Sequence, residues 1–173
     1  MSTERIREAL HGATAHLSEH PDEARYTDSP ATAKLGQGLR VEVEGASGES
    51  AATDMPESVG GTNSAPSPGW LFRAAVASCE ATLIAMRAAH EGVALSRLHV
   101  EVVSESDDRG ILGLDDQVPA GPLSMSVRVR VAAADVSDDR IRDLVAWAHQ
   151  HCPVQDAATR AVPMTLTVDV EQP

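Results

Sequence analysis

The chain has 173 residues, a length that fits one domain with a single hydrophobic core. Apolar residues make up 42% of the chain but aromatic residues only 2%, so the core must be built from aliphatic side chains. The formal net charge is −12 and the few basic residues form no cluster, which argues against nucleic acids and anionic membranes as partners, because both are bound through Lys and Arg.

The sequence contains neither a secretory signal nor a membrane span by pattern. Residues 1–17 scatter Arg, Glu and His among apolar positions and lack the run of about 7–15 apolar residues that a signal peptide needs. No stretch approaches about 20 consecutive apolar residues. We therefore expect a cytoplasmic protein, and because the cytosol keeps thiols reduced, any disulfide between the two cysteines should be transient.

The N-terminal segment carries a helical pattern. Apolar residues recur at intervals of three or four, which predicts an amphipathic helix over residues 3–19 that ends before Pro21. These apolar residues are Ile6, Leu10, Ala13 and Leu17. We expect residues 1–30 to form this helix and a linker, and residues 31–173 to form a single globular domain.

Residues 31–67 are expected to form a hairpin followed by a loop. Beyond the Gly-rich turn at 36–38, Leu39, Val41 and Val43 alternate with charged residues, a pattern typical of a strand with one solvated face. The composition of residues 46–67, rich in Gly, Ser, Ala, Thr and Pro, predicts a loop with one short strand near residues 51–54.

The most informative segment is a long apolar helix. Ser67 is a favourable N-cap, Pro68 is favourable at the first helical position, and Gly92 is a favourable stop. Between them the residues are apolar on nearly all sides, which predicts a helix buried in a core or an interface.

The C-terminal half alternates strands with one further helix. We predict strands at residues 98–103, 123–131 and 162–170, with a polar loop between the first two. Ser137 is expected to cap a helix whose apolar stripe ends at Cys152 and which Pro153 closes. The order of elements predicts an α+β fold with a mainly antiparallel sheet.

The two cysteines both lie on apolar helical faces. Cys79 is midway along the long helix and Cys152 ends the stripe of the second. Packing of the two helices could bring the thiols within bonding distance, but the sequence alone does not show that they meet. Redox chemistry is one interpretation of this pair. The other is purely structural, because a free cysteine often behaves as a small buried hydrophobe.

Several short motifs, taken in order, resemble those of the OsmC/Ohr family of thiol-dependent hydroperoxide reductases. The resemblance covers roughly residues 31–170. It rests on GGTN at 60–63, SP at 67–68, LFRAAVASC at 71–79, GV at 92–93, LHVEV at 98–102 and HCPV at 151–154.

This resemblance implies a homodimer in which mainly antiparallel sheets wrap two long central helices, here with an extra N-terminal helix. The active site would lie at the subunit interface, with Cys79 as the peroxidatic and Cys152 as the resolving cysteine. The implied activity is reduction of organic hydroperoxides, or of hydrogen peroxide, with an external thiol as reductant and without a cofactor or metal ion.

The sequence departs from the family pattern at the groups that activate the thiolate. The family uses an Arg from the N-terminal hairpin held by a Glu after the helix-starting Pro, but Gly69 stands at the Glu position and Lys34 near the Arg position. Arg40 is a weaker substitute. The alternative hypothesis is therefore a non-catalytic dimer of the same fold that binds a small apolar ligand at the interface.

Two further groups of polar residues are interpreted as structural rather than catalytic or metal-binding. Arg73, Glu80 and Arg87 recur every seven residues, which indicates a solvated or interface line of ion pairs, although Glu80 could instead orient a basic group. His149 and His151 are two residues apart on a helix and so point in different directions, and we expect no metal site there.

Overall fold

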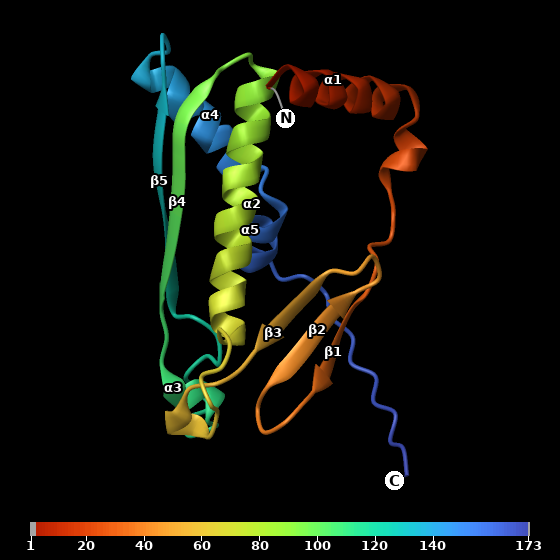
Figure 1. Cartoon of the computed structure of the whole chain (residues 1–173), viewed down its shortest axis with the longest axis vertical. Coiled ribbons are helices and arrows are strands. Elements are labelled where there is room, and N and C mark those ends of the chain that lie inside the picture. The colour runs from red at the N-terminus through yellow and green to blue at the C-terminus, as the bar shows by residue number, and fades with distance from the viewer. Residues whose placement is uncertain (1–2, 173) are drawn as a thin grey trace.

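The computed structural model describes residues 3–172 and has a mixed α+β architecture with antiparallel sheets, as the sequence predicts (Figure 1). The first part comprises α1 (Thr3–Glu19), the 3-10 helix η1 (Pro21–Ala24), β1 (Ala31–Leu35), β2 (Val41–Gly45), β3 (Ser50–Thr53) and the 3-10 turn η2 (Glu57–Val59). The second part comprises α2 (Pro68–His90), β4 (Leu95–Glu105), α3 (Asp108–Ile111), β5 (Ser124–Ala133), α4 (Asp138–Gln150) and α5 (Pro153–Thr159).

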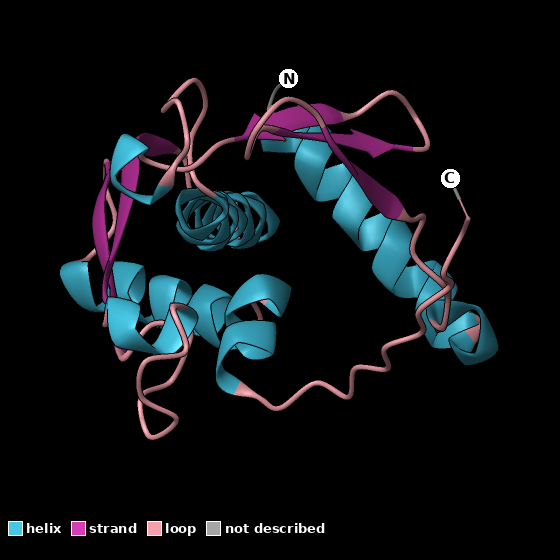
Figure 2. Cartoon of the chain, turned by 90° about the horizontal axis from the view of Figure 1, so that it is seen from below, coloured by secondary structure: helices cyan, strands magenta, loops and turns pink. Residues whose placement is uncertain are grey.

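The strands form two separate antiparallel sheets. One has the order β1-β2-β3, and the other is the pair β4-β5, which runs from Leu95 opposite Ala133 to Glu105 opposite Ser124 with a register shift between Leu95 and Arg97. Viewed along the axis of α2, this helix lies between the β4-β5 pair and the helices α4 and α5, while the three-stranded sheet stands apart (Figure 2).

The core forms where α2, β4, β5 and α4 meet. Its buried residues are Ile84, Ala88, Val93, Leu144 and Ala148. Burying an aliphatic side chain of this kind stabilises a fold by about 1.5–3 kcal/mol, so this aliphatic cluster is what fixes α4 against α2. The scarcity of aromatic residues in this cluster agrees with the composition.

The helix caps predicted from the sequence are confirmed. The side chain of Ser67 accepts a hydrogen bond from the backbone N–H of Trp70 at 3.2 Å, with Pro68 at the first position of α2. Ser137 accepts one from the backbone N–H of Arg140 at 3.3 Å. Gly92 has a φ of 71°, a left-handed conformation that favours glycine and that turns the chain from α2 into β4.

By length and composition alone α2 also meets the requirements for a membrane span, a test that core helices of soluble proteins pass as well. The sequence-based argument against any such stretch was therefore too strict. In the structure α2 packs against β4, α4 and α5 on one side and carries a buried carboxylate, Glu80.

The segment after Cys152 differs from the prediction. Pro153 follows the end of α4, but it also occupies the first position of a new helix, α5, with Cys152 as its N-cap. The sequence analysis treated Pro153 only as a stop, although proline is equally favourable at the start of a helix. The polar loop predicted at 104–122 likewise contains one helical turn, α3.

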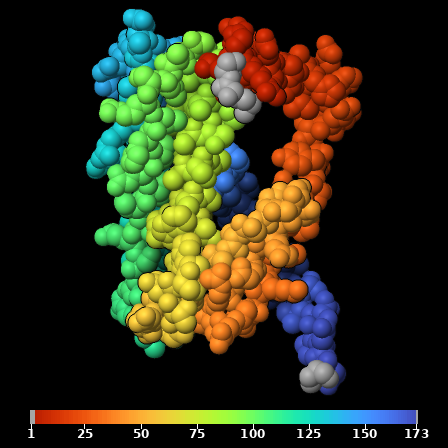
Figure 3. All heavy atoms as spheres, viewed as in Figure 1, coloured from red at the N-terminus to blue at the C-terminus, as the bar shows by residue number. Residues whose placement is uncertain are grey.

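The strand predicted at residues 162–170 is wrong for the single chain. These residues are extended but form no strand, and among residues 3–172 they have no strand partner. The chain projects away from the body here (Figures 1 and 3), and its apolar side chains lie in solvent, with Met164 94% and Leu166 87% exposed. Alternation marks a segment suited to pairing, but a ladder requires a neighbouring strand to supply the hydrogen bonds.

Candidate functional site

The structure brings Cys79 and Cys152 together. Cys79 is half-buried near the middle of α2, and Cys152 is fully buried at the start of α5, which packs against α2. Both thiols are free, and that of Cys79 lies close enough to affect the ionisation of Cys152. The sequence could place both on apolar faces, but only the fold shows that these faces meet.

Burial controls the chemistry of Cys152. Removal from water disfavours the thiolate and is the main reason why the pKa of Cys152 rises from 9.0 to about 11. The backbone N–H of Gln155 donates to the sulfur at 3.5 Å and opposes the rise, whereas the neighbouring Cys79 and Glu80 add to it. At neutral pH Cys152 is therefore a protonated thiol.

A carboxylate and an imidazole lie beside the two cysteines. Glu80, the residue after Cys79, is fully buried, and its Oε1 lies 2.7 Å from Nδ1 of His149 on α4. The other carboxylate oxygen, Oε2, is buried without a hydrogen-bond partner in the part of the chain that the structure describes. His149 lies near the end of α4, three residues before Cys152 at the start of α5, and both helices pack against α2.

The predicted line of ion pairs along α2 is wrong. Glu80 faces α4 rather than solvent, Arg73 donates to the hydroxyl of Ser104 at 3.3 Å, and Arg87 pairs with Glu91. A spacing of seven residues places three side chains in one row along a helix. Here each of the three side chains contacts a different residue outside that row. The alternative, in which Glu80 orients a basic group, agrees with its contact to His149.

The two histidines at the end of α4 point to different partners, as their spacing predicts. His151 stacks on the ring of Trp147 with ring centroids 4.0 Å apart, and its Nδ1 lies 2.7 Å from the carbonyl oxygen of Trp147. His149 faces Glu80 instead. Residues 3–172 contain no group of three or more His, Cys, Asp or Glu side chains arranged to hold a metal ion.

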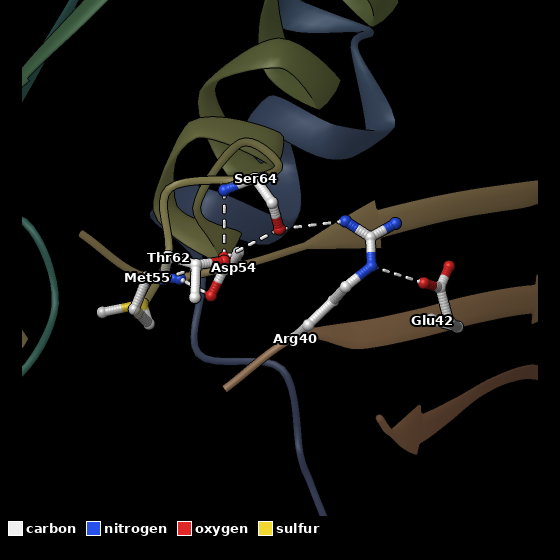
Figure 4. Close-up of polar contacts among 6 residues, drawn as sticks. All are labelled: Arg40, Glu42, Asp54, Met55, Thr62 and Ser64. Carbon is white, nitrogen blue, oxygen red and sulfur yellow. Dashed lines mark hydrogen bonds and ion pairs between the residues drawn. The ribbon is translucent and has the colours of Figure 1, made fainter. Parts of the chain in front are cut away.

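A buried aspartate holds the loop that leads into α2 (Figure 4). The carboxylate of Asp54 accepts hydrogen bonds from the backbone N–H of Met55 at 2.7 Å, from the N–H and hydroxyl of Thr62 at 3.1 and 2.6 Å, and from the N–H and hydroxyl of Ser64 at 3.0 and 2.9 Å. These donors, the Thr62 hydroxyl first among them, hold the pKa of Asp54 well below its usual range. Sequence analysis missed this anchor, whose only trace is the GGTN motif that contains Thr62.

The structure places the predicted activating residues away from the cysteine pair. Lys34 is exposed on β1, opposite Glu42 of β2, in the sheet that stands apart from α2 in Figures 1 and 2. Arg40 donates to Glu42 at 2.8 Å and to the hydroxyl of Ser64 at 3.1 Å, so it reaches the Asp54-anchored loop (Figure 4). Gly69 supplies no carboxylate, although a Cβ there would meet nothing closer than 3.8 Å.

A hollow of mixed polarity opens beside the Glu80–His149 contact. It has a volume of about 550 Å³. Its wall combines the apolar side chains of Phe72, Val76, Leu123, Met125 and Val127 with the polar ones of Ser124, His149, Gln155 and Thr159. Phe72 and Val76 lie on α2, about two turns and one turn before Cys79, respectively. A second hollow on the other side of His149 is lined by Glu80, Arg142 and strand β5.

Comparison with known proteins adds a family. The family model described as OsmC-like protein matches residues 61–167. No curated protein matches the chain significantly.

Solved structures of the same fold are numerous but distant in sequence. An OsmC-like protein from Mycoplasma pneumoniae is 13% identical with a TM-score of 0.66, covering 78% of this chain and 89% of that one. An organic hydroperoxide resistance protein, OsmC, from Legionella pneumophila is 22% identical with a TM-score of 0.57, covering 77% and 90%. An organic hydroperoxide resistance protein from Elizabethkingia anophelis is 20% identical with a TM-score of 0.57, covering 78% and 89%.

Proposed function

Because the chain belongs to the OsmC-like protein family, whose matched segment contains both cysteines, we propose that it reduces organic hydroperoxides through Cys79 and Cys152. The observation that carries this proposal is the half-buried thiol of Cys79 beside the buried thiol of Cys152. One sulfur is reachable from outside and the other is protected, which is the division of labour that a peroxidatic and a resolving cysteine require.

The chemistry balances with the two thiols and an external reductant. The thiolate of Cys79 attacks the peroxide oxygen, the O–O bond breaks, and the alcohol leaves after taking up a proton. The sulfenic acid formed on Cys79 then condenses with the thiol of Cys152 to give a disulfide and water. An external dithiol returns both cysteines to the reduced state by thiol–disulfide exchange.

The apolar part of the hollow beside His149 supports an apolar substrate. Its walls carry Phe72, Val76 and three aliphatic or thioether side chains, so an alkyl or aryl hydroperoxide would bury its hydrocarbon part there. The soluble fold of the family and the need for an external thiol support a cytoplasmic location, where thiols are kept reduced.

We further propose that the working form is a homodimer. One side of α2 is uncovered, with Trp70 51% and Phe72 37% exposed. Further along this helix, the small side chains of Ala74, Ala77, Ser78 and Ala81 would let a second helix approach closely. Figure 3 shows an open gap between α2 and the linker that follows α1. The unpaired apolar segment at residues 162–170 is a further surface that a second copy would cover. A dimer would also offer Lys34 or Arg40 a route to the cysteines that the single chain lacks.

The test is stoichiometric. Reduced protein is mixed with an equimolar amount of cumene hydroperoxide, and free thiols and intact mass are measured, alongside the variants Cys79→Ser and Cys152→Ser. We expect loss of both thiols and of two hydrogens in the wild type, no reaction in Cys79→Ser, and a dimedone-trappable sulfenic acid in Cys152→Ser.

Two results would refute these proposals. Unchanged thiols in folded wild-type protein would refute peroxidase activity and favour a non-catalytic dimer that binds an apolar ligand, with Gly69 in place of the family's Glu as the reason. Elution at the mass of one chain, measured by size-exclusion chromatography with light scattering, would refute the dimer.

A further inference from the structure

A role in packing the fold does not explain why the carboxylate of Glu80 is buried. A fully buried carboxylate is costly unless its oxygens are satisfied, yet only Oε1 has a partner, His149, and Oε2 has none within residues 3–172. An apolar residue would pack α2 against α4 without this cost. Oε2 of Glu80 is therefore a buried acceptor that has no donor among the described residues.

Glu80 and His149 are each close in sequence to one of the two cysteines. Glu80 directly follows Cys79 on α2, and its charge acts on the ionisation of Cys152. His149 precedes Cys152 by three residues and has 45% of its side chain exposed, on the wall of the hollow of mixed polarity. The buried carboxylate of Glu80 and the partly exposed imidazole of His149 together form a path between the buried sulfur of Cys152 and solvent.

The resolving step needs such a connection. Cys152 is a protonated thiol at neutral pH, but a thiolate is the attacking species in disulfide formation. Because Cys152 is fully buried, water cannot accept its proton in place. A base within the protein must do so.

We propose that Glu80 and His149 act as a proton-transfer pair for the thiol of Cys152. As the sulfur of Cys152 bonds to that of Cys79 and the S–O bond of the sulfenic acid breaks, the Cys152 proton passes to the Glu80 carboxylate. The departing hydroxide takes a proton from the imidazolium of His149 and leaves as water, so the pair ends the step with the proton count it began with. The assignment rests on the proposed function for its oxidant.

The other charged or titratable groups around the pair are few. From α2 it faces Cys79, from the start of α5 Cys152, and from α4 Arg142, which lines the hollow shared with Glu80. The strand β5 contributes Val127, Val129 and Val131 to the hollow that Glu80 lines, and Ser124, Met125 and Val127 to the other, so it adds no titratable group there. Glu80 is thus the carboxylate whose charge acts on the ionisation of Cys152, and His149 is its hydrogen-bond partner.

The step can be tested without any peroxide. An aromatic disulfide, dithiobis(nitrobenzoate), reacts with Cys79 to form a mixed disulfide and release one thionitrobenzoate. Attack by Cys152 then releases a second thionitrobenzoate and forms the internal disulfide. The rate of the second release, measured by stopped-flow absorbance from pH 6 to 10, reports the reaction of Cys152 alone.

The two roles open to Glu80 predict opposite signs. If it acts only through its negative charge, Glu80→Gln lowers the pKa of Cys152, exposes more thiolate and speeds the second release. If it accepts the proton, Glu80→Gln slows the second release by on the order of 10²-fold at pH 7 and makes it rise about tenfold per pH unit. We expect the second result, and a smaller slowing in His149→Gln.

The control is His151→Gln, which changes a histidine on the same helix end that does not face Glu80 and should leave the rate unchanged. If Glu80→Gln does not fold, His149→Gln compared with His151→Gln decides the matter. An unchanged or faster second release in the Glu80 and His149 variants overturns the pair, as does release of a single equivalent by the wild type. Failure of the proposed function would instead show as a normal second release without any reaction with cumene hydroperoxide.

Discussion

The burial of Cys152 predicts how its reactivity depends on pH. Its pKa lies at about 11 rather than 9.0, mainly because the buried sulfur is poorly solvated as a thiolate. A displacement from 9.0 to about 11 lowers the thiolate fraction at pH 8 about a hundredfold, since each pH unit is a factor of ten. Steric protection of a sulfur with 0% exposure lowers the rate further.

The assay compares the same residue in two states. Iodoacetamide labelling of Cys152 is followed by site-resolved mass spectrometry in the reduced native chain and in the chain unfolded in urea. At pH 8 we expect labelling of native Cys152 to be at least about a hundredfold slower. The native rate should keep rising about tenfold per unit until pH 11, whereas the unfolded rate should level off above pH 9.

A native rate that levels off near pH 9, or that stays within tenfold of the unfolded rate, would refute the reasoning. The same displacement has a consequence for stability. Because the folded pKa is raised, the stabilisation is fully present below pH 9 and is lost as the pH rises toward 11. The free energy of unfolding in urea should fall between pH 9 and 11 in the wild type and fall less in Cys152→Ala.

Three further predictions concern the framework of the site. Asp54→Ala should lower the Tm at pH 7, and since the folded pKa of Asp54 is depressed, the wild-type advantage should be complete above about pH 4 and shrink in acid, as measured by scanning calorimetry. Ser67→Ala removes the N-cap of α2 and should cost about 1 kcal/mol in urea unfolding, and Ser67→Asp should restore it. Ile84→Ala should cost about 2–5 kcal/mol because Ile84 is fully enclosed, whereas the exposed Ile111→Ala should change stability by no more than about 0.5 kcal/mol; equal effects would contradict the assigned core.

The features that sequence predicts well here are those whose causes are local. A cap depends on one side chain and the N–H groups that follow it, so Ser67 and Ser137 were identifiable from their neighbours. A glycine stop such as Gly92 depends on one backbone conformation. The α+β class follows from the periodicities of the segments, which are also local.

The features that sequence did not predict depend on what lies across a packing surface. Glu80 belongs to a polar row on α2 by spacing, and only the packing of α4 makes it buried and paired with His149. The segment at residues 162–170 alternates as a strand does, but pairing requires a partner that the single chain does not supply. The helix α5 was hidden because Pro153 is compatible with both an end and a start.

The position of the carboxylate links these observations to the chemistry. The family pattern expects a Glu at the start of the central helix, where this chain has Gly69, and the described structure instead holds a carboxylate at Glu80, three turns further along the same helix. A carboxylate at the helix start would act on a cation near the peroxide, whereas Glu80 acts on the ionisation of Cys152. The two steps of the proposed cycle should therefore respond separately to substitution. Changes at Lys34 or Arg40 should alter the reaction with peroxide, and changes at Glu80 or His149 should alter the closure of the disulfide.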